Sequence, residues 1–347
     1  MSQLGLIALM GSGETAPSGR ILHEWSFKKL SSPVKVSVVE TPAGFELNSS
    51  QVAGKISDFV TQRLKNYKPI VEIIPARRRD GKFSTNNLDI LSPLLDSDYI
   101  FLGPGSPSYA VNHLSNSIAW EIITARHRLG TCLSFSSSGA IAIGEKALPV
   151  YEIYKVGMDP KWIPGLDLLG NFGLRIACVT HWNNTEGGTN IDTSKCYMGQ
   201  SRMDQLVSSI QPEINILGID EHTALMIDLT QKTCSVVGKG SITIINSNGT
   251  TTFQTGENFS TDILGDVYFP KQGEGIDSDV WEKVVTHHRK IRENQPLPDK
   301  VINLIKERSE ARDRKDWDQS DLLREQLVDQ GYSVKDTSDG PKISPIR

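Results

Sequence analysis

Short apolar runs alternate with amphipathic stretches of helical length over the first 150 residues. The apolar runs, each bounded by Gly, Pro, Ser or charged residues, lie at residues 4–10, 34–39, 71–74, 99–102 and 131–135. The helical stretches between them lie at residues 20–30, 51–67, 86–95 and 106–125. Buried parallel strands read as continuous apolar runs, and they alternate with helices along the chain. The pattern therefore predicts an α/β fold with a doubly wound, mostly parallel sheet, in which residues 4–10 form a buried first strand rather than a signal peptide.

A different pattern follows between residues 176 and 270, where short strands are separated by turn signals. Segments 233–237, 241–246 and 251–255 are rich in β-branched residues, and Asn248-Gly249 is typical of a hairpin turn. We predict that these three segments form a hairpin meander, an antiparallel extension of the main sheet.

The composition changes again after Lys271. Residues 272–279 are rich in Gly and acidic residues and predict a hinge, and residues 280–294 predict a charged helix. Residues 299–330 predict a two-helix hairpin with its turn near Lys315-Asp316, with Trp317 in its core and Gly331 as the stop of the second helix. The predicted organisation is a catalytic-type domain over residues 1–272, a linker and helix over 273–295, and a helical tail over 296–347.

Composition narrows the function classes. The 347 residues carry a formal net charge of −4, which excludes a basic nucleic-acid footprint over the whole surface but not a local patch. No apolar run reaches the length of about 18 residues that a membrane span needs, so no membrane association is predicted. The four cysteines are widely spaced, which argues against disulfides or a zinc site and fits a reducing cytoplasm. The P-loop and full GxGxxG patterns are missing from the sequence, so we predict neither a metal nor a cofactor.

A serine-rich turn is the first candidate for chemistry. The residues Ser136-Ser137-Ser138-Gly139-Ala140 follow a predicted strand and open a predicted helix. A sharp strand-to-helix turn exposes a hydroxyl at the end of a sheet, and small residues after the serine permit the turn. The alternative is a serine-rich helix cap without catalytic meaning. Ser137 and Ser136 are both candidates for the nucleophile.

A serine nucleophile needs a base, and the base needs a carboxylate that orients it. His181 follows the apolar run 174–179 and is therefore expected at a strand end. Glu221 stands at the start of another predicted strand, where Asp220 and His222 compete with it for the orienting role.

Two glycine-rich loops are also expected at the carboxyl ends of strands, where ligands bind in such sheets. They are residues 11–15, which include Gly13 and Glu14, and residues 103–107, which include Gly105 and Ser106. Their backbone N–H groups are candidate donors to a ligand, although glycine at a strand end also serves close packing.

These motifs together resemble the peptidase E and cyanophycinase family over residues 4–270. The family pattern has a Gly-rich first loop, a second Gly-rich loop, a Ser-Ala-Gly-Ala elbow, Asp-x-His-Phe, Arg-x-x-Arg-Leu and Gly-Ile-Asp-Glu-x-Thr-Ala. The corresponding segments here are GSGE, GPGSP, Ser137-Ser138-Gly139-Ala140, Val179-Thr180-His181-Trp182, Arg202-Met203-Asp204-Gln205-Leu206 and residues 218–224. The last block is the most specific match.

The resemblance implies serine hydrolases on the class I glutamine-amidotransferase-like, flavodoxin-like fold. It implies that Ser137 is the nucleophile, His181 the base and Glu221 the orienting carboxylate. Backbone N–H groups of Gly105 or Ser106 and of Ser138 would hold the oxyanion. Gly13, Glu14 and Arg202 are weaker candidates for substrate binding. The implied substrate is a small, acidic (aspartyl) peptide, for which Arg202 and the triplet Arg77-Arg78-Arg79 could supply positive charge.

The sequence departs from the family pattern at several positions. Phe135 stands where the family has Gly two residues before the nucleophile, and its bulk is expected to crowd the elbow. Ser138 replaces the usual Ala, and Gln205 replaces the second Arg. Residues 183–189 read as an insertion that could form a lid. A non-catalytic binding protein on the same fold is therefore the alternative function, and an amidotransferase using Cys132 is a weaker one.

The tail carries a second resemblance, to the C-terminal end of cysteinyl-tRNA synthetases. It covers about 50 residues and includes Ile305 to Arg312, Lys315-Asp316-Trp317, Gly331 and residues 336–340. The resemblance implies tRNA as a partner, and a docking or dimerisation module (a homodimer or another protein partner) is the alternative. Residues 296–347 contain 10 Lys and Arg against 11 Asp and Glu, so RNA binding would need local segregation of charge, for which Arg308, Arg312 and Lys315 share a predicted face.

Overall fold

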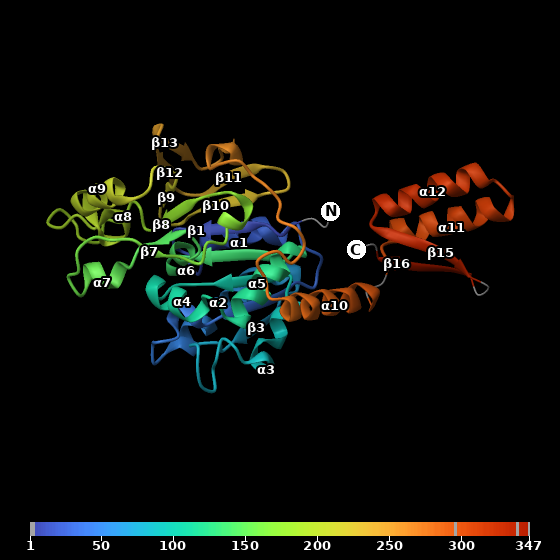
Figure 1. The fold of residues 1–347 in the computed structure, drawn as a ribbon, viewed down its shortest axis with the longest axis horizontal. Helices are drawn as coiled ribbons and strands as arrows, with labels where there is room; N and C mark the ends of the chain where they lie inside the picture. The colour runs from blue at the N-terminus through green and yellow to red at the C-terminus, as the bar shows by residue number, and fades with distance from the viewer. Residues whose placement is uncertain (1–3, 295–296, 338–339, 346–347) are drawn as a thin grey trace. The chain divides into compact units, whose positions relative to one another are not determined.

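The computed structural model describes residues 4–294, 297–337 and 340–345. They divide into two compact units, residues 4–284 and Val285–Arg347, which are described separately (Figure 1). The division falls within helix α10 (Ser278–Asn294), whose first half packs on the first unit through Val280, Trp281 and Val284. The predicted domain boundaries near residues 272 and 295 stay a prediction.

The five predicted strands of the first 150 residues form the parallel centre of an eight-stranded sheet. Its order is β14-β11-β10-β1-β5-β4-β2-β3, and the steps from β1 to β3 are parallel. The parallel strands are β1 (Ile7–Met10), β2 (Lys35–Val39), β3 (Ile70–Ile74), β4 (Tyr99–Leu102) and β5 (Cys132–Ser136). The antiparallel strands are β10 (Thr223–Asp228), β11 (Thr233–Gly238) and β14 (Asn258–Ser260). The predicted doubly wound, mostly parallel sheet with an antiparallel extension is confirmed.

The side chains of the strands alternate between the two faces of the large sheet, and helices cover both faces. Successive side chains of a strand point to opposite faces. Ile7 and Leu9 belong to one core cluster, together with residues of helices α4 and α5, whereas Ala8 and Met10 belong to a second cluster, together with residues of α1 and α2. The helices of this half are α1 (Gly19–Phe27), α2 (Ser49–Arg63), α3 (Leu88–Leu91), α4 (Pro107–Leu114), α5 (Ile118–Arg128) and α6 (Ser138–Ala142).

Local backbone chemistry divides the helix predicted over residues 106–125. Asn116 adopts a left-handed φ of 54°, and Ser117 caps α5 by accepting a hydrogen bond from the Trp120 N–H at 3.2 Å. A short polar side chain at such a position begins a new helix because it accepts from one of the first free N–H groups. The predicted helix over residues 86–95 is likewise a short α3 followed by a 3-10 turn, Ser92–Asp96, with proline in its first turn.

The predicted hairpin of segments 241–246 and 251–255 is confirmed, but the prediction that segment 233–237 pairs with it in a three-strand meander is wrong. Strand β11 pairs with β10 and β14 in the large sheet, whereas β12 (Ser241–Asn246) and β13 (Gly249–Gln254) belong to a second sheet of order β13-β12-β9-β8. The chain changes sheets between β11 and β12, where Gly238 has a φ of 131° that other residues rarely adopt. The second sheet also contains β8 (Ile176–Val179) and β9 (Asn215–Ile219), and short elements around it are β6 (Lys146–Ala147), α7 (Val150–Tyr154), β7 (Ile163–Pro164), α8 (Ser194–Tyr197) and α9 (Gly199–Ser209).

The C-terminal unit contains the predicted helical hairpin, α11 (Asp299–Asp313) and α12 (Trp317–Asp329). It also contains a strand pair that was not predicted, β15 (Tyr332–Thr337) and β16 (Gly340–Pro345), and Gly331 provides the left-handed stop with a φ of 81°. The core of this unit is formed by the buried side chains of Val301, Leu304, Ala311, Leu323, Leu327 and Val334. The prediction that Trp317 anchors this core is wrong, because its side chain is 55% exposed.

The helices within the described residues give no support for a membrane span: none of them combines the length and apolar character that a span requires.

Candidate active site

Ser137 sits on a sharp turn between β5 and α6, as predicted. Its backbone has a φ of 51° and a ψ of −116°, a region that residues with a side chain rarely occupy. Its N–H donates to the Met10 carbonyl at 3.0 Å, which ties the turn to the end of β1. A Cβ at Gly139 would lie 2.5 Å from the Leu102 carbonyl oxygen, so glycine is required two residues later. Such strained conformations persist where the surrounding structure holds them, and they concentrate at functional sites.

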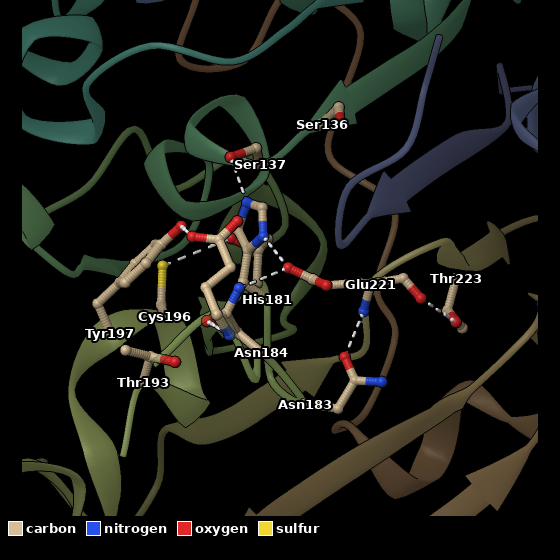
Figure 2. A network of polar contacts seen from close by, with 12 residues as sticks. Ser136, Ser137, His181, Asn183, Asn184, Thr193, Cys196, Tyr197, Glu221 and Thr223 are labelled. Atoms are coloured by element: carbon tan, nitrogen blue, oxygen red, sulfur yellow. Dashed lines mark hydrogen bonds and ion pairs between the residues drawn. The ribbon is translucent and has the colours of Figure 1, made fainter. Parts of the chain in front are cut away.

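A chain of hydrogen bonds links Ser137 to His181 and Glu221 (Figure 2). The Ser137 Oγ lies 3.0 Å from His181 Nε2, and His181 Nδ1 lies 2.8 Å from Glu221 Oε1. A carboxylate accepts only, so Nδ1 carries the ring proton of a neutral His181 and Nε2 accepts the hydroxyl proton. His181 follows β8 and Glu221 lies in the turn from β9 to β10, so three segments far apart in sequence meet at one edge of the fold.

Two asparagines hold Glu221, and sequence reasoning did not single them out. Asn184 Nδ2 donates to Glu221 Oε1 at 2.9 Å, and the Glu221 N–H donates to Asn183 Oδ1 at 2.8 Å. Burial raises the pKa of Glu221, but the hydrogen bonds from Asn184 and His181, with the nearby charge of His222, outweigh burial and leave that pKa below its usual value. The sequence contains a signal for these two residues: the pair Asn183-Asn184 begins two residues after His181, within the predicted insertion.

The structure separates Ser137 from its competitors. Ser136 is fully buried, and its Oγ donates to Glu14 Oε2 at 2.7 Å, away from His181 (Figure 2). Asp220 accepts hydrogen bonds from the N–H and Oγ of Ser241, both at 2.8 Å, and His222 Nδ1 lies 3.4 Å from Ser18 Oγ. The residues brought together are therefore Ser137, His181 and Glu221.

The predicted oxyanion donors differ in their availability. The Ser106 N–H donates to the Pro42 carbonyl at 2.9 Å, so the prediction that it could serve as a donor is wrong. Ser138 is the first residue of α6, and its N–H therefore has no acceptor within that helix. Gly105 has a φ of 151°, and a Cβ there would lie 1.9 Å from the Pro42 carbonyl oxygen. The loop of Gly105 touches the Ser137 turn, because Gly139 N–H and Ser138 Oγ both donate to the Gly103 carbonyl.

The weaker candidates lie around this centre. Gly13, with a φ of 80°, packs so closely that a Cβ would lie 2.2 Å from His222 Nδ1. Glu14 is held by Ser136 and also accepts a hydrogen bond on its carbonyl from His23 Nε2 at 3.0 Å. Arg202, on α9, is exposed, and its Nη1 lies 3.5 Å from the carbonyl of Tyr197.

Two arginines of the basic triplet are engaged in structural contacts. Arg77 Nε donates to Glu40 Oε2 at 2.6 Å, and its Nη2 donates to Ser50 Oγ at 2.7 Å. Arg79 Nη2 donates to the backbone carbonyls of Asn112 and Ser115. These contacts fix the loop after β3 and use donors that acidic substrate recognition would have needed.

Phe135 does not crowd the turn. Its side chain is fully buried in the large core cluster, with its ring centroid 6.5 Å from that of Trp120. Cys132, the amidotransferase alternative, lies within β5, and burial raises the pKa of its thiol to about 12. A thiol that stays protonated is a poor nucleophile.

Residues 183–197 form the other wall of the site. Tyr197 donates through its hydroxyl to Glu186 Oε2 at 2.7 Å, and its ring centroid lies 6.3 Å from that of His181. Lys195, Cys196 and Tyr197 all have positive φ values, 55°, 60° and 66°. The segment that contains the predicted insertion thus touches both His181 and Glu221.

A groove of about 820 Å³ is lined by residues of α4, of the loop before it and of α7. Its lining combines aromatic, hydroxyl and charged side chains: Phe45, Glu46, Ser106, Ser108, Tyr109, Asn112, Tyr151, Glu152 and Lys155. Within the described parts of the chain, no three His, Cys, Asp or Glu side chains are grouped so as to hold a metal ion.

Comparison with known proteins gives a separate result for each unit. Residues 294–341 match the family described as the cysteinyl-tRNA ligase anticodon binding domain. The cysteine–tRNA ligase of Methanosarcina mazei is 49% identical over 49 residues, 14% of this chain and 10% of the ligase. That of Chlamydia caviae is 44% identical over 50 residues, again 14% and 10%. The chain thus spans about a tenth of the length of the curated relatives it matches.

The first unit has the fold of a peptidase. The crystal structure of a peptidase from an acI-B1 actinobacterium superposes with a TM-score of 0.60 and 18% identity, covering 74% of this chain and 97% of the other. The chain therefore combines a unit with a peptidase fold and a C-terminal segment related to a cysteinyl-tRNA ligase domain.

Proposed function

We propose that the first unit is a serine-dependent hydrolase that cleaves amide bonds of small peptides. The observation that carries the proposal is the hydrogen-bonded chain from Ser137 through His181 to Glu221, with its nucleophile on a strained turn. Nucleophile, base and orienting acid in hydrogen-bond contact are the geometric signature of acyl-transfer catalysis. The peptidase fold of the unit is consistent with this activity.

In the proposed mechanism each of these groups carries out one step. The Ser137 Oγ attacks the carbonyl carbon of the substrate while His181 Nε2 takes the hydroxyl proton. The carbonyl electron pair moves to oxygen, where the N–H groups of Ser138 and Gly105 would donate to it; one such donor typically contributes about 3–4 kcal/mol to transition-state stabilisation. The electron pair then returns, the C–N bond breaks, and His181 gives its proton to the leaving nitrogen.

Deacylation reverses the roles. A water molecule attacks the ester carbon and gives a proton to His181 Nε2. The Ser137–carbon bond breaks, His181 returns the proton to Ser137 Oγ, and the carboxylic acid leaves. Glu221 stays ionised throughout, because its pKa lies below its usual value, and it stabilises the protonated ring of His181.

Labelling with a fluorophosphonate tests this proposal. We expect an adduct on Ser137 in the wild type that is lost in Ser137→Ala and forms at least about 100-fold more slowly in His181→Ala. Ser136→Ala is the matched control, and it should keep the adduct because Ser136 faces Glu14. An unlabelled wild-type protein that is folded would favour the alternative, a non-catalytic binding protein on the same fold.

We further propose that the C-terminal unit binds tRNA, on the strength of its match to an anticodon-binding domain. Trp317 is 55% exposed with the Arg312 guanidinium 5.5 Å from its ring centroid, an arrangement that can stack on an unpaired base. In filter binding with the full-length chain, Trp317→Ala should weaken tRNA binding by about tenfold. Leu322→Ala, a similarly exposed apolar residue of α12, is the control, and equal binding by both variants and wild type would contradict the proposal.

A further inference from the structure

Two segments that line the groove are connected to the proposed catalytic residues through intervening residues. Ser106 lines one side, and it belongs to the loop whose Gly103 carbonyl accepts hydrogen bonds from Ser138 and Gly139. Helix α7 provides Tyr151 and Glu152 on the other side and packs beside α8 (Figure 1). On that side Tyr154 contacts Tyr197 at 5.0 Å between ring centroids, and Tyr197 contacts His181. A peptide positioned for attack by Ser137 can therefore extend into this groove.

One carboxylate in the groove is incompletely satisfied. Glu152 Oε1 accepts a hydrogen bond from Ser108 Oγ, which itself lies 3.0 Å from Ser106 Oγ. Glu152 Oε2 is shielded from solvent, and it has no hydrogen-bond partner among the described residues. A carboxylate oxygen removed from water without a donor is costly, and a bound donor of opposite charge would remove that cost.

The walls around Glu152 suit a cation. Phe45 and Tyr109 pack against each other with ring centroids 5.2 Å apart and ring planes tilted by 52°, and Tyr151 lines the same groove. Aromatic faces attract ammonium and guanidinium groups. Glu46 supplies a second carboxylate, and its charge acts on Tyr151.

Positive charge reaches the groove from Lys155 and from Arg78, whose charge acts on Tyr109. Among the described residues that line it, Lys155 is the single basic one, and its Nζ lies 4.9 Å from the ring centroid of Tyr154. Arg77 and Arg79, which the expected acidic substrate would have used, are bound to Glu40 and to backbone carbonyls. This lining thus offers two carboxylates and one ammonium group.

We propose that this groove binds a positively charged group of the peptide, so that the preferred substrates are cationic rather than acidic. This inference rests on the proposed function, because only a hydrolase would make the bound peptide a substrate. The recognised group is an ammonium or guanidinium, held by Glu152 and Glu46 beside the aromatic side chains that line the groove.

Calorimetric binding to the full-length Ser137→Ala protein tests the inference without turnover. The probes are the acetylated dipeptide amides Lys-Ala, norleucine-Ala and Glu-Ala, together with norleucine-Ala amide that keeps a free amino terminus. We expect the acetylated Lys peptide to bind about tenfold more tightly than its norleucine counterpart. If the norleucine peptide with a free amino terminus binds more tightly than the acetylated Lys peptide, the charged group that the groove binds is the amino terminus of the peptide.

Glu152→Gln in the same background should reduce the preference for a cation to within about twofold. Glu282→Gln, an exposed carboxylate on α10, is the matched control and should keep it. Equal binding of the peptides, tighter binding of the Glu peptide, no heat at millimolar concentration, or a preference that survives Glu152→Gln would each overturn the inference. Failure of the wild type to react with fluorophosphonate would instead count against the hydrolase, since a cation preference in Ser137→Ala does not depend on catalysis.

Discussion

Asn184 and Glu221 are joined by a 2.9 Å hydrogen bond that ends on the same carboxylate oxygen to which His181 donates at 2.8 Å. Asn184 is 2% exposed, so this contact is shielded from water. The bond holds Glu221 in its orientation and favours its ionised form. In the proposed hydrolase, Asn184 is therefore expected to be a positioning residue that acts on His181 through Glu221.

Replacing Asn184 with Leu should slow fluorophosphonate labelling of Ser137 by about tenfold, because Glu221 loses a charged-state hydrogen bond. Loss of that bond raises the pKa of Glu221, so the acid limb of the labelling rate should move to higher pH. A rate-against-pH series for the two proteins measures both effects. Asn190→Leu, an exposed position of the same segment, is the control. Superimposable pH profiles for Asn184→Leu and wild type would refute a positioning role.

Gly105→Ala should lower the labelling rate of Ser137 by about 100-fold. A Cβ at this position would lie 1.9 Å from the Pro42 carbonyl oxygen, so the loop that provides the proposed oxyanion donor must shift. Gly54→Ala in α2 is the matched control, because a Cβ there meets nothing within 4 Å, and it should stabilise the helix by up to about 1 kcal/mol. Thermal unfolding distinguishes the two effects, and an unchanged rate in a folded Gly105→Ala protein would exclude Gly105 from the site.

Two buried histidines should make stability depend on pH below 6.5. Burial lowers the pKa of His23 and of His127 from 6.5 to about 4. The folded state keeps both rings neutral while the unfolded chain binds protons, so the free energy of unfolding falls as the pH drops from 6.5 towards 4. Each histidine should account for about 2 kcal/mol between pH 7 and pH 5.

Urea unfolding at a series of pH values measures this dependence. In the variant His23→Gln, the free energy of unfolding should fall with decreasing pH about half as steeply as the two histidines together predict. This holds even if the variant is less stable than the wild type at pH 7. The amide can replace the contacts of the ring with Tyr99 and the Glu14 carbonyl. A slope equal to that of the wild type would show that His23 is not the titrating group.

The C-terminal unit should depend on Asp336, which forms ion pairs with Arg308 and, at 3.2 Å, with Arg312. Arg308 is almost fully buried and binds Asp336 through two hydrogen bonds of 2.9 Å. These bonds hold the pKa of Asp336 below its usual 3.8, so their contribution is present above pH 3.8 and is lost as the pH falls through the lowered value. Asp336→Asn should destabilise the unit by about 2 kcal/mol, because it leaves the Arg308 charge without its carboxylate.

Amide hydrogen exchange on the full-length chain measures the loss of stability in the C-terminal unit itself. Peptides from α11, α12 and β15 should lose about 30-fold in protection in Asp336→Asn, whereas Asp329→Asn, an exposed carboxylate at the end of α12, should leave them protected. Unchanged exchange in Asp336→Asn would mean that the ion pairs of Asp336 do not stabilise the unit.

The ion pair of Arg308 with Asp336 limits what the sequence pattern of the tail could predict. The helical spacing of Arg308, Arg312 and Lys315 predicts a shared basic face, which requires that all three side chains remain exposed. Arg308 instead turns inward and binds Asp336, which lies on a strand that was not predicted. A helix pattern alone does not show which charged side chain will be buried by a distant partner.

The sequence pattern predicted the order of most elements and offered candidates for the residues of the proposed site. Runs such as residues 99–102 predicted buried strands, because short continuous apolar segments that alternate with helical stretches are typical of a parallel sheet covered on both faces. Small residues at a turn and polar residues at strand ends made Ser137, His181 and Glu221 candidates, but left Ser136, Asp220 and His222 open, and the family resemblance selected among them.

Tertiary structure alone decided which of these residues meet and what surrounds them. Ser136 and Ser137 are neighbours in sequence, yet one donates to Glu14 and the other to His181, because a φ of 51° at Ser137 turns the chain between them. The sheet change at Gly238, the hydrogen bond from Asn184 to Glu221 and the burial of Glu152 Oε2 beside the groove all depend on contacts between segments far apart in sequence. Local patterns report which face of an element is apolar, but pairing across long loops is set by packing of the whole fold, which no local pattern contains.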